Sequence, residues 1–183
     1  MSLSKIIIAF FLLINPIFTN AQYINGIGTR WNNAFMEWII YTEDEDLEGD
    51  LTLRWQLQGD WSEWDYRLGE EIGSIKMKWR DNPSQWELRG GNEIVTIYMV
   101  WPNDIREWRV TNNNVTLTLK SRWGNNLNEW QLKNDKYGHF DIFAQWENDP
   151  REWNVWDDLD ENISIHMKIA LIFIATFHSS PKG

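Results

Sequence analysis

The residues with the clearest chemical potential in this sequence are its tryptophans, of which the 183-residue chain has 14. An indole ring can stack on the face of a sugar, so regularly spaced tryptophans could form a carbohydrate-binding ladder. Five pairs stand seven residues apart: Trp31 and Trp38, Trp79 and Trp86, Trp101 and Trp108, Trp123 and Trp130, and Trp146 and Trp153. Trp61 and Trp156 fall outside this alternation, and we expect these two to be the exposed aromatic residues that bind a ligand.

The paired tryptophans have a second interpretation, which is that they belong to the core. They share an alternating pattern with leucine, valine, isoleucine and methionine residues, and aromatic pairs across two strands stabilise a sheet by about 0.2–1 kcal/mol each. We favour this interpretation for the pairs. The predicted core residues, which include two from the apolar tail, are Trp79, Trp86, Trp101, Trp108, Trp123, Trp130, Trp146, Trp153, Leu171 and Ile174.

Oxygen-rich side chains offer a second kind of chemistry, because calcium prefers oxygen ligands. Asn or Asp pairs lie between the paired tryptophans, as at Asn32-Asn33 and Asn148-Asp149, and residues 43–50 form the densest carboxylate cluster. Asx side chains commonly cap their own turns, and the cluster lacks the spacing of an EF-hand. The pattern therefore favours turns and a solvated acidic loop, and we predict no metal site and no cofactor.

Catalytic motifs are missing from the sequence. His139, His166 and His178 have no ligand-like partner three or four residues away, and there is no nucleophile elbow, phosphate loop or HExxH motif. The many carboxylates leave a glycosidase pair open, but no spacing singles out two of them. A repeat also spreads chemistry evenly, whereas catalysis needs one asymmetric constellation. We predict no catalytic residue and a protein that is not an enzyme.

Composition excludes several classes of function. Seventeen Lys and Arg residues stand against 27 Asp and Glu residues, and the net charge of -10 argues against nucleic-acid binding, which needs a basic face. The absence of cysteine excludes disulfides, thiolate zinc sites and thiol catalysis. A hydrophobic fraction of 43% with 24% charged residues is typical of one globular domain.

The first 21 residues have the pattern of a secretory signal peptide. Lys5 precedes an apolar run from Ile6 to Phe18, and the small polar stretch Thr19-Asn20-Ala21 follows. The run is shorter than the roughly 20 apolar residues of a spanning helix, although an uncleaved anchor stays an alternative. We predict cleavage after Ala21, a mature domain of residues 22–183 without a stable transmembrane span, and a location in the periplasm, on the cell surface or outside the cell.

The tryptophans also mark an internal repeat. The first tryptophan of each unit recurs every 22 to 24 residues, with a looser unit at Trp55, Trp61 and Trp64. The flanking segments alternate apolar and polar residues with a period of two, which indicates strands. About twelve strands are predicted, near 23–31, 37–43, 50–56, 62–68, 73–80, 85–90, 93–101, 107–112, 114–123, 129–134, 139–147 and 152–157.

The strand register follows if the two tryptophans of a pair face each other across a hairpin. Trp123 opposite Trp130 places Ser121 opposite Leu132, and the same rule places Met77 opposite Leu88, Met99 opposite Val110 and Ala144 opposite Val155. Between hairpins, we expect two-residue turns at Gly91-Asn92 and Asn113-Asn114, and a three-residue loop with a bulge near Gly138.

The C-terminal segment departs from the repeat. Acidic residues precede residues 163–178, His178 and Lys182 lie at or after their end, and Pro181 would stop a helix. Helix is favoured over strand, and Met167 to Phe177 is apolar nearly all round, so such a helix must be enclosed. Open sheets of more than about ten strands tend to curl. We therefore predict an antiparallel meander of about twelve strands, rolled into a barrel around this helix.

A twelve-stranded meander barrel closed on a hydrophobic C-terminal helix resembles the tubby-like fold, which tubby proteins, phospholipid scramblases and LURP-one-related proteins share. The resemblance covers residues 23–178 and rests on the repeated hairpins and the tail from Met167 to Phe177. It implies contact with membrane lipids or phosphoinositides and assigns no functional residue.

Taken together, the sequence favours an exported, non-catalytic protein with a binding or structural role at the cell envelope. Its partner would be a glycan or another envelope component. A carbohydrate-binding module that uses exposed tryptophans, a lipid-contacting protein and a glycosidase are the alternatives.

Overall fold

The computed structural model describes residues 23–32 and 34–182, which form twelve β-strands and one α-helix. The predicted signal peptide lies outside the described residues. The strands are β1 (Ile24–Trp31), β2 (Ala34–Thr42), β3 (Glu48–Trp55), β4 (Asp60–Leu68), β5 (Glu71–Trp79), β6 (Asn82–Gly90), β7 (Glu93–Trp101), β8 (Asp104–Thr111), β9 (Thr116–Ser121), β10 (Glu129–Asn134), β11 (Gly138–Trp146) and β12 (Asp149–Leu159). A 3₁₀ turn, η1 (Gln56–Gln58), joins β3 to β4.

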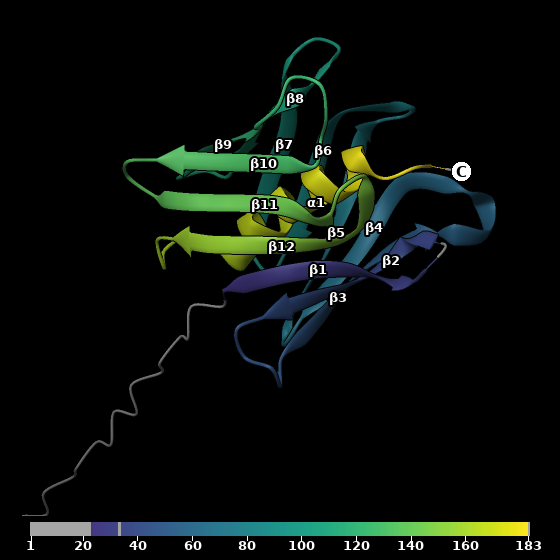
Figure 1. Ribbon diagram of the computed structural model, residues 1–183, viewed down its shortest axis with the longest axis horizontal. Helices are drawn as coiled ribbons and strands as arrows, with labels where there is room; N and C mark the ends of the chain where they lie inside the picture. The colour runs from purple at the N-terminus through teal and green to yellow at the C-terminus, as the bar shows by residue number, and fades with distance from the viewer. Residues whose placement is uncertain (1–22, 33, 183) are drawn as a thin grey trace, which may run out of the picture.

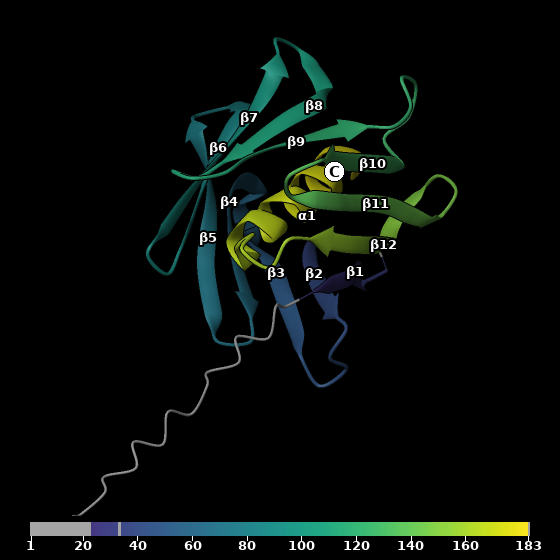
Figure 2. The ribbon, with the colours of Figure 1, turned by 90° about the vertical axis from the view of Figure 1, so that its left-hand side faces the viewer.

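The twelve strands form one closed antiparallel barrel, as predicted. Each strand pairs with its neighbours in the chain, and β1 pairs with β12 to close the sheet. Figures 1 and 2 show the meander running round the barrel from β1 to β12. Closure leaves no unpaired edge strand, which is the usual hazard of a long open sheet.

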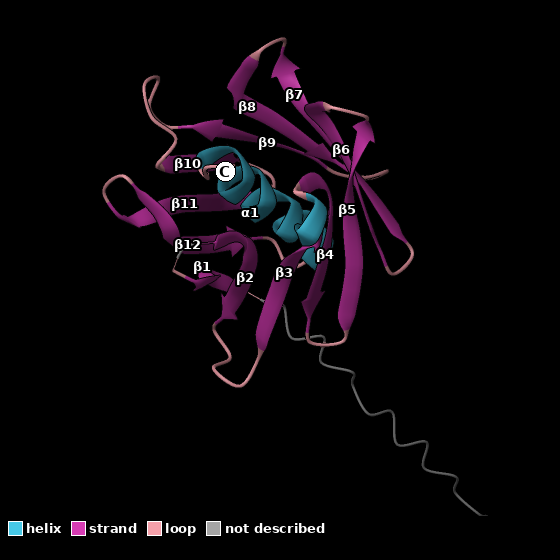
Figure 3. Cartoon of the chain, turned by 90° about the vertical axis from the view of Figure 1, so that its right-hand side faces the viewer, coloured by secondary structure: helices cyan, strands magenta, loops and turns pink. Residues whose placement is uncertain are grey.

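The helix α1 (Ile165–Ser179) runs through the barrel, as Figure 3 shows. Ser164 caps its first turn, where its hydroxyl accepts a hydrogen bond from the Met167 N–H at 3.2 Å. Every residue from His166 to Phe177 is buried, including the predicted core residues Leu171 and Ile174. No helix in the described part of the chain is long and apolar enough to cross a membrane.

Six buried tryptophans, one from each hairpin, surround the helix. They are no more than 2% exposed: Trp38, Trp64, Trp86, Trp108, Trp130 and Trp153. The indole N–H of each donates to the backbone carbonyl three residues earlier, at 2.7–3.2 Å. A buried indole needs such a partner, and a local carbonyl supplies it; the Trp130 indole lies in addition 3.4 Å from the Ser179 hydroxyl at the end of α1.

The other tryptophan of each hairpin is exposed, so the prediction that both belong to the core was wrong for half of them. Trp79, Trp101, Trp123 and Trp146 are 46–59% exposed, whereas Trp86, Trp108, Trp130 and Trp153 are buried as predicted. The predicted register was wrong by two residues. Met77 pairs with Trp86, Met99 with Trp108, Ser121 with Trp130 and Ala144 with Trp153.

The turn chemistry explains this difference. Trp79 pairs with Asn82 at the end of its hairpin, and the register shifts between that pair and Met77–Trp86. Asp81 adopts a left-handed conformation with φ of 59°, and the Asn82 side chain accepts the Ser84 N–H at 3.0 Å. Between these two pairs β5 advances by two residues and β6 by four, so β6 has two extra residues. Because two is an even number, the same side chains of both strands still face the core, and Trp79 lies at the rim.

The connections between hairpins agree with the predicted turns. Leu88 pairs with Val95 and Val110 with Leu117. Gly91 has a φ of 54° in a two-residue turn, and Gly138 has a φ of 91° after the three-residue loop that follows Asn134. The turns that join one hairpin to the next therefore lie at one end of the barrel. The turns within the hairpins, which follow the first tryptophan of each, lie at the opposite end.

A buried ion pair joins the helix to the strands that close the barrel. Lys168 Nζ lies 2.8 Å from Asp157 Oδ2, and both side chains are at most 3% exposed. The Asp157 carboxylate also accepts the backbone N–H groups of Ile24 and Leu159, at 3.2 and 3.3 Å. Burial raises the pKa of Asp157, although the Lys168 ammonium opposes this shift.

Removing one member of this pair should be strongly destabilising. Lys168→Met leaves a buried carboxylate without its counter-ion, and we expect a loss of about 3–5 kcal/mol in the free energy of unfolding. The double variant Lys168→Met with Asp157→Asn should recover most of this loss, because no net charge is then buried. Urea unfolding measures both, with exposed Lys133→Met as the control. A single variant as stable as the wild type would contradict the prediction.

His178 gives the barrel a pH-dependent contact at the other end of the helix. Its ring stacks on Trp108 with centroids 4.4 Å apart and meets Phe177 at 5.0 Å. Burial, with a smaller contribution from Lys182, lowers the pKa of His178 to about 3. In the unfolded chain the pKa of histidine is about 6.5. Below that pH the unfolded state therefore binds a proton that the folded state does not.

The stabilising contribution of a neutral His178 should thus be present above about pH 6.5 and fall as the pH decreases towards 3. Because the ring is half-buried, we expect up to about 1 kcal/mol per pH unit from this group. His178→Phe should flatten the dependence of the unfolding free energy on pH between 6.5 and 4. Parallel curves for wild type and variant would refute this role of His178.

Candidate functional site

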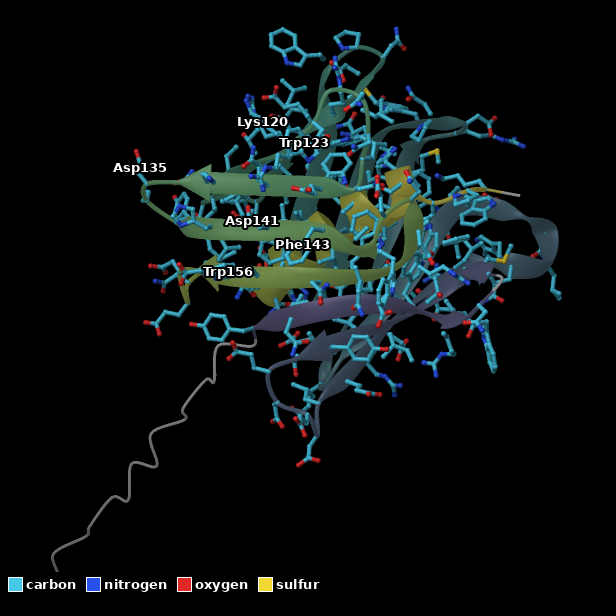
Figure 4. The ribbon with its side chains drawn as sticks, in the orientation of Figure 1. Lys120, Trp123, Asp135, Asp141, Phe143 and Trp156 are labelled. Carbon is cyan, nitrogen blue, oxygen red and sulfur yellow. The ribbon has the colours of Figure 1, made fainter. Side chains whose placement is uncertain are left out.

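An aromatic pocket lies on the outer wall of the barrel over β10, β11 and β12. It has a volume of about 630 Å³. Trp156 of β12, Phe143 of β11 and Trp146 at the end of β11 contribute its aromatic rings and are 69%, 40% and 59% exposed. Figure 4 shows Trp156, Phe143 and Asp141 on this wall, with Trp123 and Lys120 over the neighbouring strands.

Strand alternation positions these side chains. On β11, Phe140 and Ile142 are fully buried and face the core, so Asp141 and Phe143 face outward. Asp141 is paired with Trp156 on β12 and with Gln131 on β10. Directly opposed residues of an antiparallel pair have Cβ atoms about 5 Å apart, so the carboxylate of Asp141 lies between an indole and an amide.

Asp141 is the unusual residue of this pocket. Its Oδ1 atom is buried and has no hydrogen-bond partner, and it is the one such side-chain atom found among the described residues. A carboxylate oxygen shielded from water without a donor costs free energy, and native proteins leave few of them. Because Asp141 as a whole is only half-buried, a rotation of its carboxylate brings this oxygen to a ligand that donates a hydrogen bond.

The pocket forms where the hairpins depart from their common geometry. The second residue after the first tryptophan is left-handed in three hairpins, at Asp81, Asn103 and Asn148. Asn125, at the same position of the fifth hairpin, does not share that conformation. Strands β9 and β10 pair only at Trp130–Ser121 and Gln131–Lys120. The Asn128 carbonyl instead accepts the Ala144 N–H at 2.8 Å. The loop before β10 is thereby drawn towards β11, and it borders the pocket with Asn126 and Asn128.

The hydrogen bonds of the first tryptophan in each hairpin also differ near the pocket. The indole N–H groups of Trp31, Trp55, Trp79 and Trp101 donate to a Glu or Gln side chain of their own hairpin, at 3.1–3.2 Å. No such bond is seen for Trp123 or Trp146 in the part of the chain that the structure describes. In the fifth hairpin, Glu129 pairs with Arg122 at 3.1 Å, and the Arg122 guanidinium lies 5.3 Å from the Trp123 ring.

The two predicted ligand-binding tryptophans have different environments. Trp156 is exposed and lines the pocket. Trp61 is half-buried and packs against the buried Trp64 with ring centroids 5.8 Å apart, so the prediction that it is exposed was wrong, while its role in binding stays a prediction. Its carbonyl accepts the Trp64 indole N–H at 3.2 Å, which gives Trp61 a structural role.

Sequence reasoning did not single out Asp141 or Phe143. The alternation along β11 places both on the outward side, and an outward Phe two residues from an outward Asp was the available signal. What the pattern could not give is the unpaired state of the carboxylate, because that depends on the neighbouring strands.

A second pocket, of about 660 Å³, lies at the end of the barrel where α1 begins, and Glu71, Glu161 and Lys168 are among its lining residues. His166 Nδ1 lies 2.7 Å from the Tyr66 hydroxyl and its Nε2 lies 3.5 Å from Glu71, at the start of α1. Burial raises the pKa of Tyr66. Within residues 23–32 and 34–182, no group of three or more His, Asp or Glu side chains lies close enough to hold a metal ion.

Comparisons with known proteins give no relative: no family model, no curated protein and no solved structure matches this chain. The resemblance to the tubby-like fold therefore stays a prediction.

If Asp141 is retained for a ligand, its replacement should stabilise the free protein. Asp141→Thr removes the unpaired oxygen and places a good strand-forming residue on β11, and we expect the free energy of unfolding to rise by about 1 kcal/mol. Asp158→Thr is the matched control, because it makes the same change at an exposed residue of β12. Equal effects of the two substitutions in urea unfolding would contradict the interpretation.

Proposed function

We propose that this protein is an exported, non-catalytic glycan-binding protein of the cell envelope, and that its primary site is the pocket over β10–β12. The observation that carries the proposal is the buried, unpartnered Oδ1 of Asp141 opposite the exposed ring of Trp156. Export rests on the signal-peptide pattern of residues 1–21.

The pocket has the two kinds of group that sugar recognition needs. A pyranose ring has an apolar face that stacks on an indole, and hydroxyl groups around its edge that need acceptors and donors. Trp156 and Phe143 supply aromatic surface on the two sides of Asp141. Asn126, Asn128 and Gln131 supply amides, which both donate and accept. Polar residues make up more than half of the lining, which suits a ligand with many hydroxyl groups.

The placement of the pocket favours binding over hydrolysis. A glycosidase holds its scissile bond between two carboxyl groups with distinct roles. Here the unpartnered carboxylate has an aromatic neighbour across the strand pair and another two residues along the strand, which suits one sugar unit bound by stacking. Gln131, the partner on the third strand, is an amide and can act neither as a general acid nor as a nucleophile. Of the two other carboxylates that line the pocket, Glu129 is paired with Arg122 at 3.1 Å and Glu147 lies in the turn after Trp146.

Titration with soluble hexasaccharides tests this function. The probes are cellohexaose, xylohexaose, laminarihexaose and chitohexaose, and the readout is tryptophan fluorescence with calorimetry. We expect at least one of them to bind, and both Trp156→Ala and Asp141→Thr to weaken its affinity at least about tenfold, which corresponds to about 1.4 kcal/mol.

Trp79→Ala is the matched control, since it removes a tryptophan that is 57% exposed, against 69% for Trp156, from a hairpin that does not line the pocket. Its affinity for hexasaccharides should equal that of the wild type. Failure of all four sugars to bind, or equal binding by wild type and Trp156→Ala, would overturn the proposal.

A further inference from the structure

A ring of exposed tryptophans lies at one end of the barrel. Each odd-numbered strand ends at one of them or, for β9, two residues before it. All odd-numbered strands end on the same side because the barrel is an antiparallel meander. These six rim tryptophans are 42–60% exposed: Trp31, Trp55, Trp79, Trp101, Trp123 and Trp146. The core does not require them, because the second tryptophan of each hairpin fills the space around the helix.

Five of the six rim tryptophans have contacts that hold their rings in place, and Trp146 is the exception among the described residues. In four hairpins the indole N–H donates to a Glu or Gln that directly precedes the buried tryptophan, as from Trp101 to Glu107 at 3.1 Å. Lys78 lies 5.9 Å from the ring of Trp79, and Arg122 lies 5.3 Å from that of Trp123. These contacts restrict the ring while much of its surface stays open to solvent.

We propose that the rim tryptophans form an array of weak secondary sites that binds a long, uncharged polysaccharide chain. This inference rests on the proposed function and extends it from one sugar-binding pocket to a preference for polymers. Trp146 belongs both to the pocket and to the rim, so a chain that leaves the pocket meets the array directly. Exposed aromatic surface that recurs regularly calls for a ligand that also repeats.

The distances favour a polymer. Neighbouring strands are about 4.8 Å apart, and each rim tryptophan is two strands from the next in a barrel whose strands are tilted by about 40°. Adjacent rim tryptophans are therefore about 12 Å apart. A short oligosaccharide in the pocket reaches few of them, whereas a long chain can engage several at once and gain avidity without any new type of contact.

The charges favour an uncharged chain. One arginine in each hairpin pairs with a carboxylate of the same hairpin: Arg30 with Glu37, Arg54 with Glu63, Arg80 with Asp81, Arg106 with Asp104, Arg122 with Glu129 and Arg151 with Asp149. Each of these arginines has a carboxylate beside it, although the Arg80–Asp81 pair is almost fully exposed, and together they do not form a basic track for uronate, sulfate or phosphate groups. The chain as a whole has a net charge of -10, which also disfavours an anionic polymer.

A membrane surface fits the rim less well. Tryptophans do collect at the interface of a bilayer, but here the turns beyond them carry the carboxylates of Asp81, Asp104 and Asp149. These groups would have to enter the headgroup region before the indole rings, at a cost in desolvation.

The test compares polymers with hexasaccharides for a variant that keeps the pocket. The rim variant combines Trp31→Ala, Trp55→Ala, Trp79→Ala and Trp101→Ala, none of which lines the pocket. Affinity electrophoresis in hydroxyethylcellulose, xylan, laminarin and glycol chitin measures polymer binding. We expect wild type to bind the polymer at least tenfold more tightly than the matching hexasaccharide, and the rim variant to lose that advantage while its hexasaccharide affinity is unchanged.

The control variant combines Ile72→Ala and Ile94→Ala, which removes exposed apolar side chains from the opposite end of the barrel and should leave polymer binding intact. Circular dichroism checks that the rim variant folds, and the four single variants, each expected to weaken polymer binding about twofold, replace it if it does not. Equal polymer binding by wild type and rim variant would overturn the array while the pocket stands.

Other outcomes also contradict the array. Binding to alginate as tight as to the uncharged polymers would refute the argument from paired charges. Sedimentation with phosphatidylcholine and phosphatidylglycerol vesicles, lost in the rim variant, would assign the rim to a membrane instead. A dimer that the rim variant abolishes would assign it to a second copy of the chain. Absence of binding by wild type to every hexasaccharide and every polymer would overturn the primary function as well.

Discussion

The structure depends on burying an apolar helix inside a sheet of its own chain. A helix with its side chains is about 10–12 Å wide, so a barrel that encloses it must be lined by large residues to leave no void. One buried tryptophan from each hairpin meets this need: Trp86 contacts Phe173 and Phe177 of α1 at 4.9 and 4.8 Å. Each buried indole bonds a carbonyl of its own hairpin, and the helix meets the remaining polar groups of the lining near its ends, where His166 contacts Tyr66 and Lys168 pairs with Asp157.

The architecture could be predicted because it follows from periodicity and from one constraint. Alternation of period two gives the strands, and an apolar segment such as Met167–Phe177 needs to be enclosed. The position of each tryptophan within a hairpin could not be predicted, because moving one strand by two residues along its partner leaves the same side chains facing the core. Pairing Met77 with Leu88 or with Trp86 gives the same alternation, and only the turn at Asp81-Asn82 decides between them.

The candidate site could be predicted less well, for a different physical reason. Exposure of Trp156 follows from its place outside the tryptophan alternation, but Trp61 shares that property and packs on Trp64. What separates the two is the neighbouring side chain, which the spacing does not specify. The unpaired state of Asp141 likewise depends on Gln131 and Trp156, which come from two other strands. Features that arise between strands are accessible only once the register is known.

In each hairpin one tryptophan is buried inside the barrel and the other is exposed at its rim. The buried one fixes the sheet to the helix, and the rim one is free to contact a partner, so surface residues can change without loss of the core. The fifth hairpin shows how a distinct site can arise from this plan. Its turn lacks the left-handed residue found at Asp81 and Asn103, the β9–β10 pairing shortens, and Asn128 turns to Ala144. A local loss of pairing thereby opens a pocket beside Asp141, while Trp130 and the core beneath remain packed.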